Sequence, residues 1–184
     1  MGANGVALKW PDGSRNLLHY LGNTGEPLEQ DVNKVLDDVP EFKKSIEQRQ
    51  HGLGVDAVER VKQLGATEPI TFPVNTQWIG FGYDKDGKQY DNMNWFYALG
   101  GWQSNLTGQV TVYPPNQPGE PYRYEISTHV NLRDQYNFDP GKMANVGPVE
   151  LPDSLSADLH AKGLAQEYAM FGRSDIIVAK GEEP

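Results

Sequence analysis

The chain has 184 residues, of which 38% are hydrophobic and 22% charged, and it contains no cysteine. This length is enough for one domain of ordinary size with its own core. The absence of cysteine excludes disulfides, thiolate metal sites, iron–sulfur clusters and a cysteine nucleophile. The 25 acidic residues outnumber the 16 basic ones and give a net charge of −9, so nucleic acid is not expected as a partner.

The start of the chain carries no recognisable targeting segment. It lacks the basic and apolar regions of a signal peptide, and no apolar run approaches the roughly 20 residues of a transmembrane segment. We therefore expect any export to use another route or a larger polypeptide that carries this chain. Polar and turn-forming residues dominate residues 1–27, which is typical of a linker.

The first third of the chain is predicted to be helical. Apolar residues recur at helical spacing over residues 28–39, 41–50 and 55–64, with proline or glycine at the boundaries. We expect residues 1–66 to form a linker and helical lead-in, and residues 67–184 to form a β-rich domain.

Strand periodicity begins at residue 70. Apolar and polar residues alternate over 70–78, 102–113 and 122–133, and the proline-rich stretch 114–121 predicts a hairpin loop between the last two. Such alternation indicates an antiparallel sheet or small barrel with one solvated face. A short helix after Pro152 and a final strand near residues 176–179 complete an α+β fold.

Isolated motifs in the sequence carry little chemistry. Asp84 to Gly87 looks like the start of a calcium loop, but the later ligands do not follow, so an Asp-Gly hairpin turn is the simpler interpretation. His19 and His51 have no catalytic neighbours in sequence and are expected to be ordinary surface or packing residues. His129 lies on the polar face of a predicted strand, where it faces either a cleft or solvent.

Residues 134–139 form a dense polar cluster directly after the strand over 122–133. The cluster holds two carboxylates, a phenol and an amide, namely Asp134, Tyr136, Asn137 and Asp139. Carboxylates at this spacing can converge on one divalent cation, which would neutralise a phosphate and polarise it towards attack. The alternative is an Asx-type turn in which Asp134 and Asn137 only bind backbone donors.

Three segments, 71–76, 106–112 and 134–139, resemble the C-terminal activity domain of colicin M and its bacteriocin relatives in order and spacing. Helix 55–64 and residues 164–168 also fit, so the resemblance covers about two thirds of the chain. It implies a part-open, β-barrel-like α/β domain. In that family the domain is a toxin that hydrolyses the undecaprenyl-linked peptidoglycan precursor lipid II between lipid and pyrophosphate, with a required divalent cation.

The family signature is Asp-x-Tyr-Asp, followed five residues later by His-Arg. Asp134 matches the first aspartate and Tyr136 the tyrosine. Asn137 stands in place of the second aspartate, although Asp139 lies two residues further on. On this resemblance we expect Asp134 to hold the metal or activate water and Tyr136 to orient the phosphate or the carboxylate. Asn137 and Asp139 complete the polar cluster. Asp134 and Asp139 are the expected ligands of the divalent cation, for which we expect Mg²⁺.

The His-Arg pair is missing, because Met143 and Ala144 stand at its positions. A phosphoester hydrolase needs positive charge on the phosphate oxygens and often a general acid or base. Candidate replacements are Lys142 in the same loop, His129 on the strand and His160 on the predicted short helix.

The leading hypothesis is an antibacterial toxin domain, of the kind carried by polymorphic toxins in interbacterial competition, that acts as a metal-assisted phosphodiesterase on lipid II. It would be secreted or delivered to the envelope or periplasm of a target bacterium and opposed by a cognate immunity protein. One alternative is a non-catalytic relative that lost the His-Arg pair and perturbs or binds the envelope. Another is a structural β-domain, such as a phage-tail module.

Overall fold

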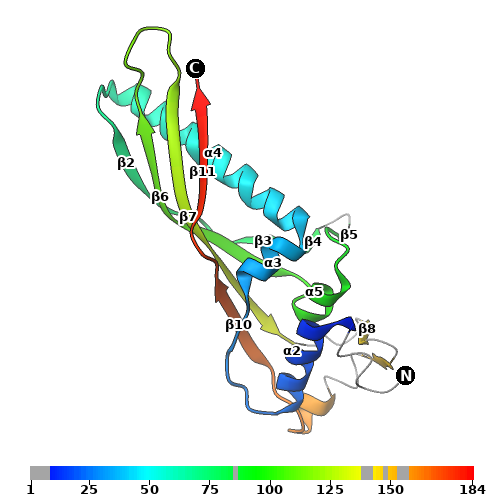
Figure 1. The fold of residues 1–184 in the computed structure, drawn as a ribbon. Coiled ribbons are helices and arrows are strands. Elements are labelled where there is room, and N and C mark those ends of the chain that lie inside the picture. Colours follow the sequence, from blue (N-terminus) through cyan, green and yellow to red (C-terminus); the bar gives the residue numbers. More distant parts are fainter. Residues whose placement is uncertain (1–8, 85–86, 138–142, 147–148, 153–157) are drawn as a thin grey trace. The chain divides into compact units, whose positions relative to one another are not determined.

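The computed structural model describes residues 9–84, 87–137, 143–146, 149–152 and 158–184 (Figure 1). The chain forms two compact units, each assembled from three separate segments. Unit 1 comprises Met1–Gln30, Gly80–Gln103 and Leu132–Gly172, and unit 2 comprises Asp31–Ile79, Ser104–Asn131 and Arg173–Pro184.

Unit 2 combines sheet strands with a long helix. Its strands are β2 (Ile70–Asn75), β11 (Ile177–Glu183) and the larger parts of β6 (Trp102–Tyr113) and β7 (Tyr122–Tyr136). β2 pairs antiparallel with β6, and β11 pairs antiparallel with β7. α4 (Pro40–Leu64) runs along these strands and contacts β11 and α3 (Val32–Asp38) (Figure 1).

Alternating side chains of β6 and β7 form the core of unit 2, as the sequence pattern predicts. Each side chain of this core buries apolar area worth about 1.5–3 kcal/mol of the free energy of folding. The strands and α4 contribute the following residues, each at most 5% exposed: Leu106, Val110, Val112, Tyr124, Ile126, Val130, Phe42, Ile46, Val58 and Val61.

α4 is one continuous helix of 25 residues, where we predicted two shorter helices. Gly52 and Gly54 lie inside it, although each glycine in a helix costs about 1 kcal/mol relative to alanine. Gly54 is required by packing, since a Cβ at this position would lie 2.3 Å from the ring of Tyr124. The helix ends at Gly65, which adopts the left-handed conformation with φ of 60°.

The helix predicted over residues 28–39 begins later than expected. Leu28–Glu29 form strand β1, which pairs parallel with β10 (Tyr168–Arg173) in unit 1. α3 starts at Val32 because the side chain of Asp31 accepts a hydrogen bond from the backbone of Lys34 at 3.0 Å.

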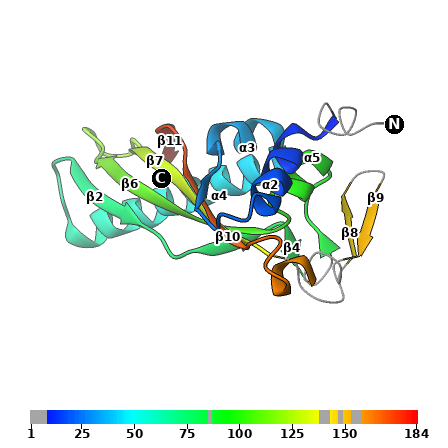
Figure 2. The same cartoon turned by 90° about the horizontal axis from the view of Figure 1, so that it is seen from below.

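Unit 1 begins with α2 (Pro11–Leu21), a helix in the stretch that we predicted to be a linker. Figure 2 shows α2 beside α5 (Met93–Ala98), and the two helices are in contact. Unit 1 also contains a helical turn at residues 158–161 and the ends of β6 and β7. Its remaining strands are β1, β10, β4 (Tyr83–Asp84), β5 (Gly87–Lys88), β8 (Met143–Val146), β9 (Val149–Pro152) and most of β3 (Ile79–Phe81).

Within the described residues, the main sheet has seven strands in the order β1-β10-β7-β6-β2, with β11 also paired to β7 and β3 to β6. The sheet is open and mixed, since β1 and β10 are parallel, and the fold is α+β as predicted. β4 and β5 pair antiparallel, as the predicted hairpin at Asp84 to Gly87 requires. No helix in the described part of the chain is long and apolar enough to cross a membrane.

Candidate functional site

Asp134 and Tyr136 lie inside β7, which continues three residues beyond the predicted strand. Residues two apart on a strand project to the same face of the sheet, so both share the face of the buried Leu132. Tyr136 is 8% exposed and Asp134 is half-buried. A carboxyl group therefore lies on the core-facing side of a strand, where an apolar residue would normally stand.

Burial controls the ionisation of Asp134. Removal of the carboxyl group from water raises its pKa from 3.8 to about 7, although a hydrogen bond with the backbone of Gln135 opposes this effect. Among the described residues no ion pair involves Asp134, so no cation offsets the cost of burial there. The carboxyl group is consequently close to half-protonated at neutral pH, a property common in functional sites.

Aromatic rings from α2 and β10 of unit 1 gather around Tyr136. The ring of Tyr168 on β10 stacks on it at 5.0 Å between centroids, and Tyr20 on α2 lies at 5.9 Å. The ring of His19 contacts the ring of Tyr168 edge-on, with 4.4 Å between their centroids. We call His19, Tyr168 and Tyr136 the ring stack. Burial raises the pKa of Tyr136 and of Tyr168, so both hydroxyl groups remain protonated at neutral pH.

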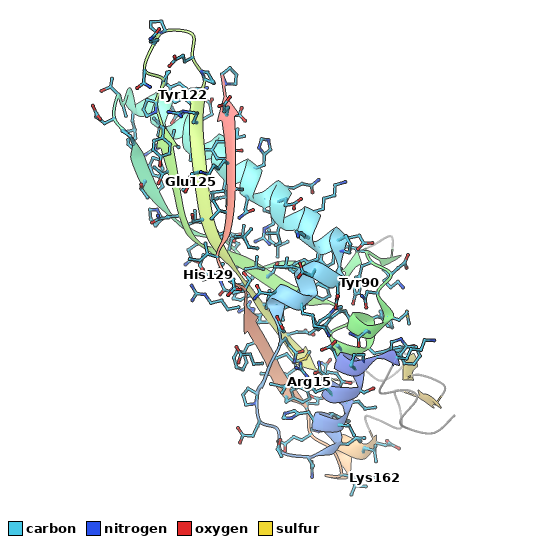
Figure 3. The ribbon with its side chains drawn as sticks, viewed as in Figure 1. Arg15, Tyr90, Tyr122, Glu125, His129 and Lys162 are labelled. Carbon is cyan, nitrogen blue, oxygen red and sulfur yellow. The ribbon has the colours of Figure 1, made fainter. Side chains whose placement is uncertain are left out.

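Arg15 places a positive charge close to the ring stack. Its guanidinium donates to Gln30 Oε1 at 2.7 Å and to Asn16 Oδ1 at 3.2 Å, and its charge partly opposes the upward shift in the pKa of Tyr168. The side chain remains exposed on α2 (Figure 3). Arg15 is thus a fixed, solvent-accessible cation in unit 1.

Buried amides hold α2 in position. The fully buried Asn16 donates to the carbonyl of Ala98 at 2.8 Å and to Gln30 Oε1 at 3.2 Å. The backbone carbonyl of Asn16 accepts a hydrogen bond from the Tyr168 hydroxyl at 2.9 Å. These bonds fix the position of α2 against α5 and β10, and hence the positions of Arg15 and His19.

The remaining predicted site residues are spread over the chain. Asp139 and Lys142 lie outside the described residues. Asn137 is exposed immediately after β7, and His160 is exposed with Nδ1 3.3 Å from the carbonyl of Ala165. His129 belongs to unit 2, where its Nδ1 donates to the carbonyl of Ser174 at 2.8 Å and leaves Nε2 as the acceptor. The structure thus brings together Asp134 and Tyr136 from the predicted set.

A divalent cation is compatible with Asp134 as one ligand, because a half-buried carboxylate without an ion-pair partner would be stabilised by a bound cation. No group of three or more His, Asp or Glu side chains able to hold a metal occurs in the described residues. The second predicted ligand, Asp139, lies outside those residues.

Sequence reasoning missed Arg15, His19 and Tyr168. Arg15 and His19 are four residues apart, which places them on one face of a helix. Pro11 at the first turn of that helix was an available signal. The position of Tyr168 beside Tyr136 depends on strand pairing, which no local pattern predicts.

No protein-family model and no curated protein matches the chain. Among solved structures, the chain is similar to PaeM, a colicin M-like bacteriocin produced by Pseudomonas aeruginosa, with a TM-score of 0.45 and 12% identity over 94% of this chain and 51% of PaeM. It is also similar to a truncated form of the bacteriocin syringacin M from Pseudomonas syringae pv. tomato, with a TM-score of 0.42 and 17% identity over 93% of this chain and 60% of that one. PaeM is described as colicin M-like, the family that the sequence motifs resemble, and this chain spans between half and two thirds of either structure.

Proposed function

We propose that this chain is an antibacterial toxin domain that hydrolyses lipid II by metal-assisted phosphoester cleavage. The observation that carries the proposal is the placement of Asp134 and Tyr136 together on the core-facing side of β7. These two residues match the aspartate and tyrosine of the colicin M signature. A carboxylate half-buried without an ion-pair partner among the described residues is a poor structural element, which favours a functional role.

Each residue has a distinct proposed role. Asp134, together with Asp139, would hold a divalent cation, for which we propose Mg²⁺. Such a cation, when bound, would offset the negative charge of the phosphate and make the phosphorus more electrophilic. Asp134 holds its carboxyl group on the buried face, and Tyr136 limits the movement of that face through the ring stack.

Positive charge on the phosphate must come from residues other than the missing His-Arg pair. Arg15 offers a guanidinium, which matches phosphate geometry better than the ammonium of Lys142. His160, which belongs to unit 1 like Asp134, remains a candidate for proton transfer. We propose that such a toxin is delivered to the envelope of a target bacterium and is blocked by a cognate immunity protein.

The test is incubation of the protein with lipid II in detergent and Mg²⁺, followed by detection of the water-soluble pyrophosphorylated disaccharide-peptide. We expect release by the parent chain and a loss of about 10³-fold or more in Asp134→Ala. Asp56→Ala, which changes an exposed carboxylate on α4, is the matched control and should retain full activity. Equal rates for the parent chain and Asp134→Ala would refute the proposed role of Asp134.

Metal binding is tested separately by thermal unfolding. Mg²⁺ should raise the melting temperature of the parent chain and leave that of Asp134→Asn unchanged. Stabilisation without any cleavage would favour the second candidate function, a non-catalytic relative that binds an envelope component. The specific observation in favour of this second function is the presence of Met143 and Ala144 at the positions of the His-Arg pair.

A further inference from the structure

A groove crosses the exposed face of the unit 2 sheet. One pocket of about 440 Å³ is lined by Tyr113 of β6, by Arg123 and Glu125 of β7, and by Lys180 and Glu182 of β11. A second pocket of about 400 Å³ is lined by residues of the 114–121 hairpin loop and shares Arg123 and Glu182 with the first. Because of this shared lining the pockets adjoin, and we call them together the Tyr113 groove.

Four charged side chains of the Tyr113 groove form opposite pairs. Lys180 Nζ lies 2.7 Å from Glu125 Oε2, and Arg123 and Glu182 are direct partners in the antiparallel register of β7 and β11. The guanidinium of Arg123 also lies 6.0 Å from the ring centre of Tyr113. A third carboxylate, that of Glu120 in the hairpin loop, accepts hydrogen bonds from the backbone of residues 116 and 117. The groove therefore presents an aromatic ring, two cations and three carboxylates, so it carries no excess of positive charge that would attract an anion.

This combination limits the class of ligand. An anion would meet the carboxylates of Glu125 and Glu182, and an apolar ligand would bury charged groups at a cost of several kcal/mol. A neutral polyhydroxy ligand can accept hydrogen bonds from Arg123 and Lys180 and donate to the carboxylates, while the Tyr113 ring packs against its C–H face. The combined volume of the two pockets lies in the range of small-molecule sites.

We propose that the Tyr113 groove binds a short neutral oligosaccharide. Tyr113 is 37% exposed at the end of β6. On β7, Tyr122 lies next to the hairpin loop and Glu125 lies three residues further from it (Figure 3). The groove belongs to unit 2, whereas Asp134 belongs to unit 1, so this binding activity goes beyond the proposed hydrolysis and does not depend on it.

Two-dimensional ¹H–¹⁵N NMR of the full chain, titrated with chitotriose and with maltotriose, tests the proposal. We expect at least one of them to shift the amide signals of Tyr113, Arg123 and Lys180, with a dissociation constant of about 1 mM. Tyr113→Ala should weaken binding about tenfold, and Glu182→Gln, which keeps the shape of the side chain, about threefold. Val178 lies on the same face of β11 as Lys180 and Glu182 but outside the groove, so the Val178→Ala variant should bind like the parent chain.

Three results would overturn the proposal. The first is the absence of groove shifts with both saccharides. The second is a set of shifts with inorganic phosphate but with neither saccharide, which would make the groove an anion site. The third is unchanged binding in both Tyr113→Ala and Glu182→Gln. Since Glu182→Gln alters only an exposed side chain, it keeps the test valid if Tyr113→Ala fails to fold.

Discussion

The two units are stabilised by different kinds of contact. Unit 2 has a core of aliphatic and aromatic side chains from alternating strand positions and one face of α4. Unit 1 packs large aromatic side chains, including Tyr20, Trp95, Trp102, Tyr136 and Tyr168, each at most 8% exposed. Hydrogen-bonded polar side chains are buried in both units, such as Asn16 in unit 1 and Gln50 in unit 2. Unit 1 also holds the half-buried carboxyl of Asp134, whose burial raises its pKa to about 7. The two units therefore differ in ring packing and in a titrating group on the core-facing side of β7.

The largest expected effect tests packing in unit 2. Gly54→Ala should lower the free energy of unfolding by about 2–3 kcal/mol, because the new Cβ would displace the buried ring of Tyr124. Gly52→Ala in the same helix meets no atom within 4 Å and should raise it by about 1 kcal/mol. Urea unfolding measures both values, and effects of the same sign would show that Tyr124 does not fill this space.

A second substitution tests the polar interior of unit 1. Asn16→Leu should cost about 2 kcal/mol, because it leaves the carbonyl of Ala98 without its hydrogen bond from this side chain. Gln103→Leu removes an amide whose oxygen accepts one hydrogen bond from Arg133 at the surface of the same unit, and it should change stability by no more than about 0.5 kcal/mol. Similar costs for both variants would show that burial of the Asn16 hydrogen bonds adds nothing to the stability of unit 1.

Prediction of the long strand β6 from the sequence was accurate for a physical reason. β6 begins and ends at the predicted residues because its alternation reflects one buried and one solvated face. α2 was missed because Asp12 and Asn16 look like solvated linker residues, whereas their side chains bond within unit 1. Those bonds join residues about 80 positions apart, and no local pattern encodes them.

The candidate site was predictable only in part. Asp134 and Tyr136 were identified by their motif, yet they were expected in a loop, because the alternation of apolar residues stops at Leu132. Asp134 occupies an inward position of β7, so its carboxyl group interrupts the alternation of apolar and polar residues that predicts a strand. The ring of Tyr168 contacts Tyr136, and that of His19 contacts Tyr168, through tertiary packing.

The smallest expected effect is a pH dependence of stability that originates in unit 1. The pKa of Asp134 is about 7 in the folded chain and near 3.8 when unfolded, so between these values the folded state holds a proton that the unfolded state releases. The free energy of unfolding should therefore fall by about 1–2 kcal/mol as pH rises from 4 to 8, and this contribution should be flat above about pH 8. The expected change in the free energy of unfolding is smaller than the full pKa difference implies, since a half-buried group relaxes towards solvent.

Chemical denaturation at several pH values in the presence of EDTA measures this dependence. Asp134→Asn should lack that part of the decline and should be more stable than the parent chain at pH 8. Asp56→Asn, at an exposed position of α4, should keep the decline. A pH profile shared by Asp134→Asn and the parent chain would show that Asp134 is solvated like an ordinary surface carboxylate.

The division of each unit into three segments has a consequence for biosynthesis. As the chain leaves the ribosome, β7 is synthesised many residues before β11. The edge of β7 over residues 122–128 therefore stays unpaired with β11 until residues 177–183 have been synthesised. Exposed strand edges of this kind template aggregation, and contacts between distant segments slow folding. The β7–β11 pairing in unit 2 can form only after translation of residues 177–183, so completion of this sheet depends on β11.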